Sequence, residues 1–187
     1  MDKKLTVKEI TYAAMGVALT AVCSWISVPA VFTTVPFTLQ TFAVCLVTAL
    51  FGLRLGLFTV VGYILLGLVG APVFAGFSGG LSALLGPTGG YIVGFLFTAL
   101  AVGLAVDRFG REWKALIPAM ALGILLCYTF GTVWFVIVYA RNNGPIGVMT
   151  ALGWCVFPYL LPDAVKIALA STLTRRLHGI VDKGLRS

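Results

Sequence analysis

Two charged residues, Asp163 and Lys166, lie deep inside a long apolar segment. Counted back from Arg175 at the end of that segment, Asp163 lies about 18 Å and Lys166 about 13 Å inside it, at a helical rise of ~1.5 Å per residue. Charge at such a depth in a membrane is unfavourable by several kcal/mol, so both side chains are expected to face a protein interior or a cavity. Their i, i+3 spacing places them on one helix face.

Two interpretations of this pair follow from the residues. In one, Asp163 and Lys166 form a private ion pair that holds helices together. In the other, each charge faces part of a polar ligand, and this is the interpretation we favour, because ionisable residues inside a membrane usually serve function. Pro158 and Pro162 lie just before the acid, and a helix broken by proline near a buried charge is a feature of transporter binding sites.

The segment that holds the pair is one of several long apolar blocks. The chain has 187 residues, of which 60% are hydrophobic and 10% charged, and its mean hydropathy is +1.05. Such a composition predicts an all-α integral membrane protein, since about 20 helical residues cross a hydrocarbon layer. No block alternates with period two, so strands are not expected. Six spans are predicted, at Thr6–Val28, Phe37–Leu53, Leu55–Val69, Tyr91–Val106, Ala115–Tyr139 and Ile146–Arg175, within a single domain covering residues 1–187.

The formal net charge of +7 is distributed unevenly between the two sides of these spans. One side receives Lys3, Lys4, Lys8, Arg54, Arg108, Arg111, Lys114, Arg175, Arg176, Lys183 and Arg186, whereas the other receives only Arg141. The positive-inside rule therefore predicts a multi-pass cell-membrane protein with both termini in the cytoplasm. The basic excess fits orientation and contact with the lipid bilayer, and it does not form the basic and aromatic surface of a nucleic-acid-binding protein.

The link from Gly70 to Gly90, between the third and fourth spans, is the second candidate for a site. It contains seven glycines and no charge, and on the predicted topology it faces the outside of the cell. A link of this length in a small domain is typically a lid or a binding loop. The Gly-Lys-Ser/Thr sequence of a phosphate-binding loop is absent, so the chain has no evident means of binding ATP itself.

The residues do not favour an enzyme. The cysteines Cys23, Cys45, Cys127 and Cys155 are scattered among the spans without metal-ligand spacing, so we expect no metal site and no cofactor. The single histidine, His178, lies in the basic tail, away from any nucleophile. A bundle that binds a small solute is the better interpretation.

Three stretches resemble the BioY family, the biotin-specific substrate-capture subunits (S components) of energy-coupling factor (ECF) transporters. They are Val35–Thr41, similar to a Pro-x-Thr-Leu-Gln motif, the run from Gly79 to Tyr91 with its paired glycines, and Pro162–Lys166 with its Asp-x-x-Lys. The resemblance covers nearly the whole chain. It implies a six-helix membrane bundle with a glycine-rich extracellular loop between helices three and four.

The resemblance also implies a biotin site and roles for its residues. Asp163 would accept hydrogen bonds from the ureido ring, and Lys166 would neutralise the valerate carboxylate or steady Asp163. Ser78 stands where relatives can have an asparagine, and Ile92 where some have an arginine. The remaining implied ligand-binding residues are Gly79 and Gln40 from the matching motifs and the aromatic residues Tyr91, Phe74 and Phe77.

Partners are implied in the same way. A transmembrane coupling subunit (T component) and two ATP-binding subunits would complete the transporter. The small residues Ala14, Gly16, Ala18 and Ala21 of the first span would either pack against another span of the chain or, as the resemblance implies, dock the coupling subunit. Two alternatives stay open: a capture subunit for another vitamin, such as thiamine or riboflavin, and a structural membrane protein in which Asp163 and Lys166 only join helices.

Overall fold

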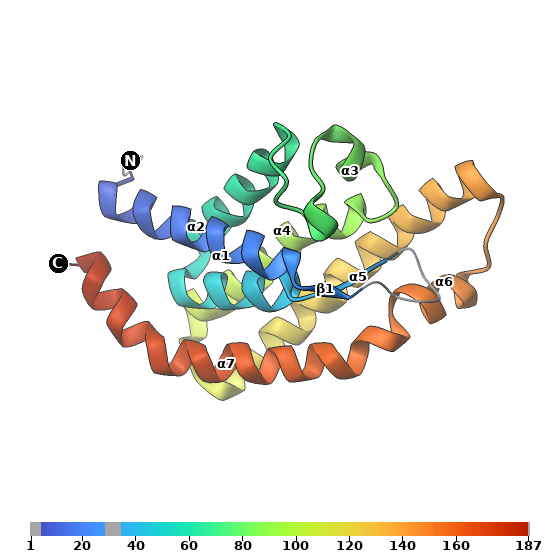
Figure 1. Cartoon of the computed structure of the whole chain (residues 1–187). Helices are drawn as coiled ribbons and strands as arrows, with labels where there is room; N and C mark the ends of the chain where they lie inside the picture. The colour runs from blue at the N-terminus through green and yellow to red at the C-terminus, as the bar shows by residue number, and fades with distance from the viewer. Residues whose placement is uncertain (1–4, 29–34, 187) are drawn as a thin grey trace.

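A computed structural model describes residues 5–28 and 35–186 of the chain, and these are almost entirely helical (Figure 1). The elements in chain order are α1 (Val7–Trp25), β1 (Ser27–Val28), β2 (Phe37–Thr38), α2 (Gln40–Leu68), the 3-10 turn η1 (Ala75–Phe77), α3 (Leu81–Leu85), α4 (Gly89–Phe109), α5 (Trp113–Asn143), α6 (Val148–Cys155) and α7 (Phe157–Arg186). The long helices run lengthwise, and both ends of the chain lie at the same end of the molecule (Figure 1).

Helix α2 folds back on itself at Gly52, whose φ of 78° and ψ of −175° lie in a region that is essentially restricted to glycine. In an unbroken helix Gln40 and Tyr63 would be about 35 Å apart. Instead Gln40 Nε2 donates a hydrogen bond of 2.7 Å to Tyr63 Oη. The two halves of α2 therefore run antiparallel, as the sequence predicts for the spans before and after Arg54.

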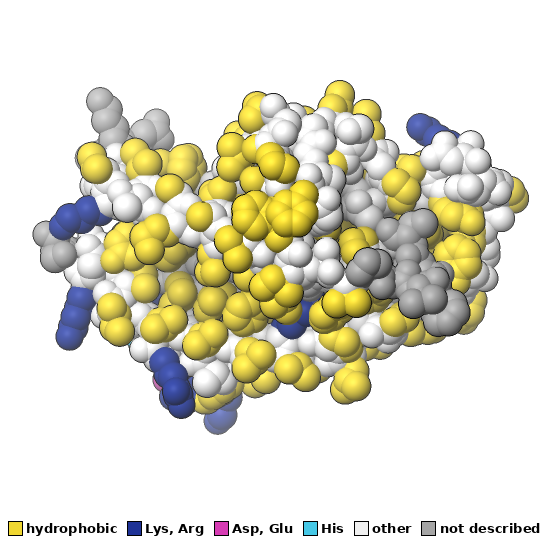
Figure 2. Space-filling view, viewed as in Figure 1, with side chains coloured by type: hydrophobic (Ala, Val, Ile, Leu, Met, Phe, Trp, Pro, Cys, Tyr) yellow, Lys and Arg dark blue, Asp and Glu magenta, His cyan; other side chains and the backbone are white. Residues whose placement is uncertain are grey.

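Small residues allow the helices to approach closely. A Cβ on Gly94 of α4 would lie 2.8 Å from Cys127 Sγ of α5, and a Cβ on Gly123 of α5 would lie 3.0 Å from Thr98 Cα of α4. Each helix thus offers a glycine to the other, an arrangement common between membrane helices. The outer faces of the helices are apolar as well, and Figure 2 shows hydrophobic side chains over much of the visible surface.

Membrane-spanning length and apolarity are met by four of the described helical segments, namely α2, α4, α5 and the stretch Val148–Leu185. This confirms a helical membrane protein, whereas the predicted count of six spans is not confirmed. The last predicted span is interrupted at Val156, between α6 and α7, and α7 continues past Arg175 to Arg186. The break precedes Pro158, which is consistent with the predicted effect of proline.

Two links differ from the prediction. The first span ends at Trp25, three residues early, because the chain then becomes extended and Ser27–Val28 pairs antiparallel with Phe37–Thr38, a short strand pair that the sequence does not indicate. The Gly70–Gly90 link contains η1, α3 and the start of α4, so it is folded rather than irregular. Residues 29–34, which link the first two predicted spans, lie outside the described residues.

Candidate ligand-binding site

Asp163 and Lys166 form a buried ion pair on α7. Lys166 Nζ lies 2.6 Å from Asp163 Oδ1, and the two residues are only 5% and 4% exposed. Neither side chain extends to the surface of the molecule. The chain therefore keeps both charges inside, as their depth in the sequence predicts.

All three donors of the Lys166 ammonium have partners. Besides Asp163, Nζ donates to the Thr38 carbonyl oxygen at 2.6 Å and to Thr41 Oγ1 at 3.2 Å. The Phe37 ring lies over the same nitrogen, 4.1 Å from its centroid, in cation–π geometry. The short strand pair and the first turn of α2 thus fix the lysine in place.

Asp163 is held by side chains from two other helices. Thr41 Oγ1 on α2 donates to Oδ1 at 3.3 Å, and the Tyr128 hydroxyl on α5 donates to Oδ2. An ionised carboxylate offers about four acceptor positions. The described residues fill three of them, so Oδ2 can accept one more hydrogen bond.

A cavity of about 270 Å³ opens beside this pair. Its volume is close to the lower end of the range of ~300–1,000 Å³ for small-molecule sites. The walls combine a few polar groups with many apolar and aromatic ones: Val35, Pro36, Thr38, Gln40, Thr41, Phe74, Ala75, Ser78, Thr88, Tyr91, Ile92, Phe95, Cys127, Tyr128, Cys155, Tyr159, Asp163 and Lys166.

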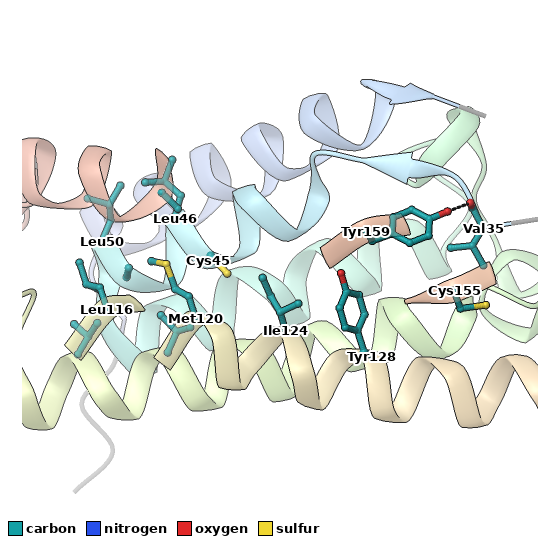
Figure 3. Close-up of a cluster of buried hydrophobic side chains, with 14 of the residues drawn as sticks. Val35, Cys45, Leu46, Leu50, Leu116, Met120, Ile124, Tyr128, Cys155 and Tyr159 are labelled. Atoms are coloured by element: carbon teal, nitrogen blue, oxygen red, sulfur yellow. Dashed lines mark hydrogen bonds between the residues drawn. The ribbon is translucent and has the colours of Figure 1, made fainter. Parts of the chain in front are cut away.

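Figure 3 shows how several of these side chains meet. Tyr128 and Tyr159 come from different helices and lie next to each other, near Cys155 and Val35. The Tyr159 hydroxyl donates to the Val35 carbonyl oxygen, which ties α7 to the segment before β2. Elements far apart in the sequence therefore build the chamber.

The Gly70–Gly90 link supplies part of the wall and is tied down at several points. Ser24 Oγ and the Tyr63 hydroxyl both donate to the Val73 carbonyl oxygen, at 2.6 and 2.8 Å. At the other end of the link Trp134 Nε1 donates to the Gly86 carbonyl oxygen at 3.0 Å. Phe74 is 1% exposed and packs on Gly67, so the side chain of this loop aromatic forms the inner wall.

Six of the eight predicted ligand-binding residues line the cavity, namely Asp163, Lys166, Gln40, Phe74, Ser78 and Tyr91. Ser78 Oγ donates to the Ala75 carbonyl oxygen of its own loop at 2.8 Å, and the Tyr91 hydroxyl lies 3.0 Å from Thr132 Oγ1. Ile92 also lines the cavity, where it is 5% exposed.

Phe77 and Gly79 do not line the cavity. Phe77 is 63% exposed and stacks on Trp25 with ring centroids 5.2 Å apart, because Gly76 and Phe77 both adopt positive φ and turn the chain outward. Gly79 lies against the Ala71 carbonyl oxygen, where any side chain would clash. Its role in this structure is close packing of the loop.

Sequence reasoning missed Thr41, Tyr128 and Tyr159 as site residues. Thr41 directly follows the predicted Gln40, and Tyr128 places a phenol in the middle of an apolar span. A buried hydroxyl must find a hydrogen-bond partner, so each could have been flagged as a candidate. The pairing with Asp163 could not, since it joins α2, α5 and α7.

The small residues predicted on the first span divide between two faces of α1. Ala14 and Ala18 are exposed, whereas Ala21 is buried in the core. Gly16 is buried against Thr59 and Phe51 of α2. Gly16 and Ala21 are therefore corrected to internal packing, because the helix turns them toward α2.

Comparison with known proteins gives a consistent result. The model of the BioY family matches residues 1–183. A probable biotin transporter BioY from Pyrococcus horikoshii is 40% identical over 172 residues, covering 92% of this chain and 97% of its own. The biotin transporter BioY from Thermotoga maritima is 34% identical over 171 residues, covering 91% and 95%.

A solved structure agrees with these relatives. The crystal structure of the S-component for biotin from an ECF-type ABC transporter superposes with a TM-score of 0.82 at 27% identity, and the match covers 94% of this chain and 95% of that one. With the family model spanning nearly the whole sequence, the chain belongs to the BioY family.

Proposed function

We propose that this chain is the biotin-binding S component of an ECF transporter. The observation that carries the proposal is the buried Asp163 carboxylate, which retains an acceptor position beside a cavity. Relatives described as biotin transporters and the matched S-component for biotin support the same ligand. A pair that served only to join helices would not need a chamber next to it.

Biotin's ureido ring carries two N–H donors, and one of them would bond to Asp163 Oδ2. A hydrogen bond to an ionised group contributes about 1.5–3 kcal/mol, more than a neutral one. The fused rings would pack against Phe74, Tyr91 and Tyr159, which line the cavity. Polar recognition at one point and apolar contact elsewhere is the usual composition of a small-molecule site.

Lys166 would act on both ends of the ligand. It holds the Asp163 side chain in place, and it is the cation nearest to an incoming carboxylate in the cavity wall. Its bond to the Thr38 carbonyl is the one we expect to exchange, because a carboxylate is a stronger acceptor than a neutral carbonyl. Ile92 supplies no charge, so the valerate group depends on Lys166.

Calorimetric titration of the purified full-length chain tests the function. Biotin should bind in the nanomolar to micromolar range, and Asp163→Asn should weaken binding by well over tenfold, since it replaces a charge-assisted bond. Asp182→Asn is the control, because Asp182 lies far along α7 and pairs with Arg111 instead. Tight binding of thiamine or riboflavin with none of biotin would reassign the subunit to another vitamin.

The thermal stability of the same variants separates ligand binding from helix joining. If wild-type chain binds none of these vitamins while Asp163→Asn unfolds, the pair is structural and the proposal fails. A folded Asp163→Asn variant with weak binding supports the ligand role.

We further propose a six-span topology with both termini in the cytoplasm. The spans would be α1, the two halves of α2, α4, α5, and α6 with α7. The placement of lysine and arginine supports this orientation. Asn142→Cys, but not Lys183→Cys, should react with a membrane-impermeant maleimide added to whole cells, because only position 142 would face outward. The four native cysteines are buried and should add no background.

The proposed partners are a transmembrane coupling subunit and two ATP-binding subunits. Ala14 and Ala18 form the exposed small-residue face of α1 on which the coupling subunit would dock. Ala14→Trp and Ala18→Trp should abolish uptake while biotin binding to the isolated chain persists. Loss of both together would indicate misfolding instead of a docking defect.

A further inference from the structure

A second hollow, of about 440 Å³, lies at the end of the molecule opposite to the α5–α6 link. The start of α5 and the last part of α7 form it, and its lining includes Arg111, Arg175, Arg176, Trp113 and Thr172. Figure 2 shows Lys and Arg side chains gathered at this end, where the chain termini lie. The hollow is separate from the cavity beside Asp163 and shares none of its lining.

The arginines of this hollow differ in how firmly they are held. Arg111 is held most firmly, because Nε and Nη2 donate to the Ala49 and Leu50 carbonyl oxygens at 2.8 and 2.9 Å and Nη1 lies 3.8 Å from Asp182 Oδ2. Arg175 lies over the Trp113 ring, 5.2 Å from its centroid, and its only described acid partner is Glu112 at 3.9 Å.

Acids balance only part of the charge in the hollow, whose lining contains one carboxylate, that of Glu112, beside three arginines. The Glu112 side chain is 74% exposed, and a pair at 3.9 Å in such a setting contributes little. Arg176 is exposed and has no acidic partner within ion-pair distance among the described residues. Two guanidinium groups are therefore available to an anion, whereas the Thr172 hydroxyl donates to the Ala168 carbonyl oxygen at 2.7 Å.

An apolar stripe leads into this hollow along α7. Val165 and Leu169 are 56% and 53% exposed, and they continue at helical spacing into Thr172 and Arg176. The order from Val165 to Arg176 is thus two exposed apolar side chains, one hydroxyl and one cation. A molecule matching this order has an acyl chain and an anionic head.

We propose that the hollow binds the phosphate of an anionic phospholipid, whose acyl chain lies along Val165 and Leu169. Arg175 and Arg176 contact the phosphate, and Trp113 lies at the level of the headgroups, where tryptophan is enriched. Basic pockets between helices at the cytoplasmic side of membrane proteins bind such headgroups. The stripe favours a lipid over a soluble anion, and the inference does not depend on which vitamin the chain binds.

Titration of the full-length chain with dioleoylphosphatidylglycerol, with bound lipid counted by native mass spectrometry, tests this site. Dioleoylphosphatidylcholine should bind at least tenfold more weakly, because each nearby arginine contributes about fivefold in affinity for an anionic lipid. Arg176→Gln should lower phosphatidylglycerol binding about fivefold, and Arg175→Gln by a similar factor. Biotin binding should stay unchanged in both variants.

Arg108→Gln is the matched control, since Arg108 lies at the same end of the molecule but outside the hollow. Equal loss of lipid in the control would mean general charge attraction and would overturn the site. Displacement of phosphatidylglycerol by millimolar inorganic phosphate would overturn the lipid as occupant. The lipid would also be overturned as occupant if Arg176→Gln left lipid binding unchanged and weakened assembly with the transporter partners. That result would assign the arginines to an acidic protein surface.

Discussion

Among the described residues, acids and bases meet in two regions, and their surroundings differ. Asp163 and Lys166 lie 2.6 Å apart with side chains only 6% exposed, beside a cavity. Arg111 and Asp182 lie 3.8 Å apart at the end of the helices, with side chains 21% and 35% exposed. The two charges of the buried pair interact strongly, whereas those of the outer pair interact weakly because water screens them.

In the second region, charged side chains form hydrogen bonds with backbone groups at helix ends. Arg111 donates to the Ala49 and Leu50 carbonyl oxygens at the end of the first half of α2, and the Asp107 carboxylate accepts from the Leu53 amide, 3.3 Å away, at the start of the second half. A cation at a helix C-terminus and an anion at an N-terminus both complement the helix dipole. This end therefore stabilises the turn at Gly52, whereas the buried pair serves the cavity.

Lys166→Met should produce the largest effect. It leaves Asp163 charged, buried and without its counter-ion, which destabilises by about 3–5 kcal/mol. The double variant Asp163→Leu/Lys166→Met removes both charges and should recover most of that stability while binding no biotin. Thermal unfolding in detergent measures the first effect and calorimetry the second. A double variant as unstable as Lys166→Met would contradict this account.

Tyr128→Phe should weaken biotin binding about tenfold or more. It removes the phenol that positions Asp163 Oδ2, and bonds to ionised groups contribute about 1.5–3 kcal/mol. Tyr139→Phe is the matched control, since Tyr139 packs between Phe135 and Trp154 outside the cavity lining. Equal losses of affinity in both variants would remove Tyr128 from the site.

Gly52→Ala should lower stability by about 1–3 kcal/mol, because alanine does not adopt this backbone conformation without strain. The new Cβ would also lie 2.6 Å from Asp107 Oδ1. Biotin affinity of the folded fraction should stay within twofold of wild type. Gly153→Ala is the control, because a Cβ there meets nothing within 4 Å and its φ is not positive. An unchanged unfolding temperature for Gly52→Ala would refute the strained turn.

Asp182→Asn should have the smallest effect, about 0.2–1 kcal/mol of stability, as expected for an exposed pair. The difference from wild type should shrink as salt is added, because screening weakens the pair. Thermal unfolding at low and at high ionic strength measures this. A loss of stability as large as that of Lys166→Met would mean that the exposed ion pair interacts as strongly as the buried one.

Prediction from the sequence succeeded where one residue or one short segment contains enough information. An acid and an amine inside an apolar block stand out because burying charge is so unfavourable, and Asp163 and Lys166 were found in this way. Prediction failed where two residues of the same type lie close together in the sequence and only one of them faces the cavity. Phe74 and Phe77 are both loop aromatics, and only the backbone turn at Gly76 places one inside and the other outside.

The sequence by itself determined the membrane-protein class, the position of the chain reversal near Arg54, and the buried charged pair, because hydropathy and charge act locally along the chain. Only the tertiary structure decided that Thr41 and Tyr128 complete the Asp163 site, and that α1 turns Gly16 and Ala21 inward while leaving Ala14 and Ala18 exposed. These outcomes depend on which helix faces pack together, and neither residue type nor spacing specifies that choice.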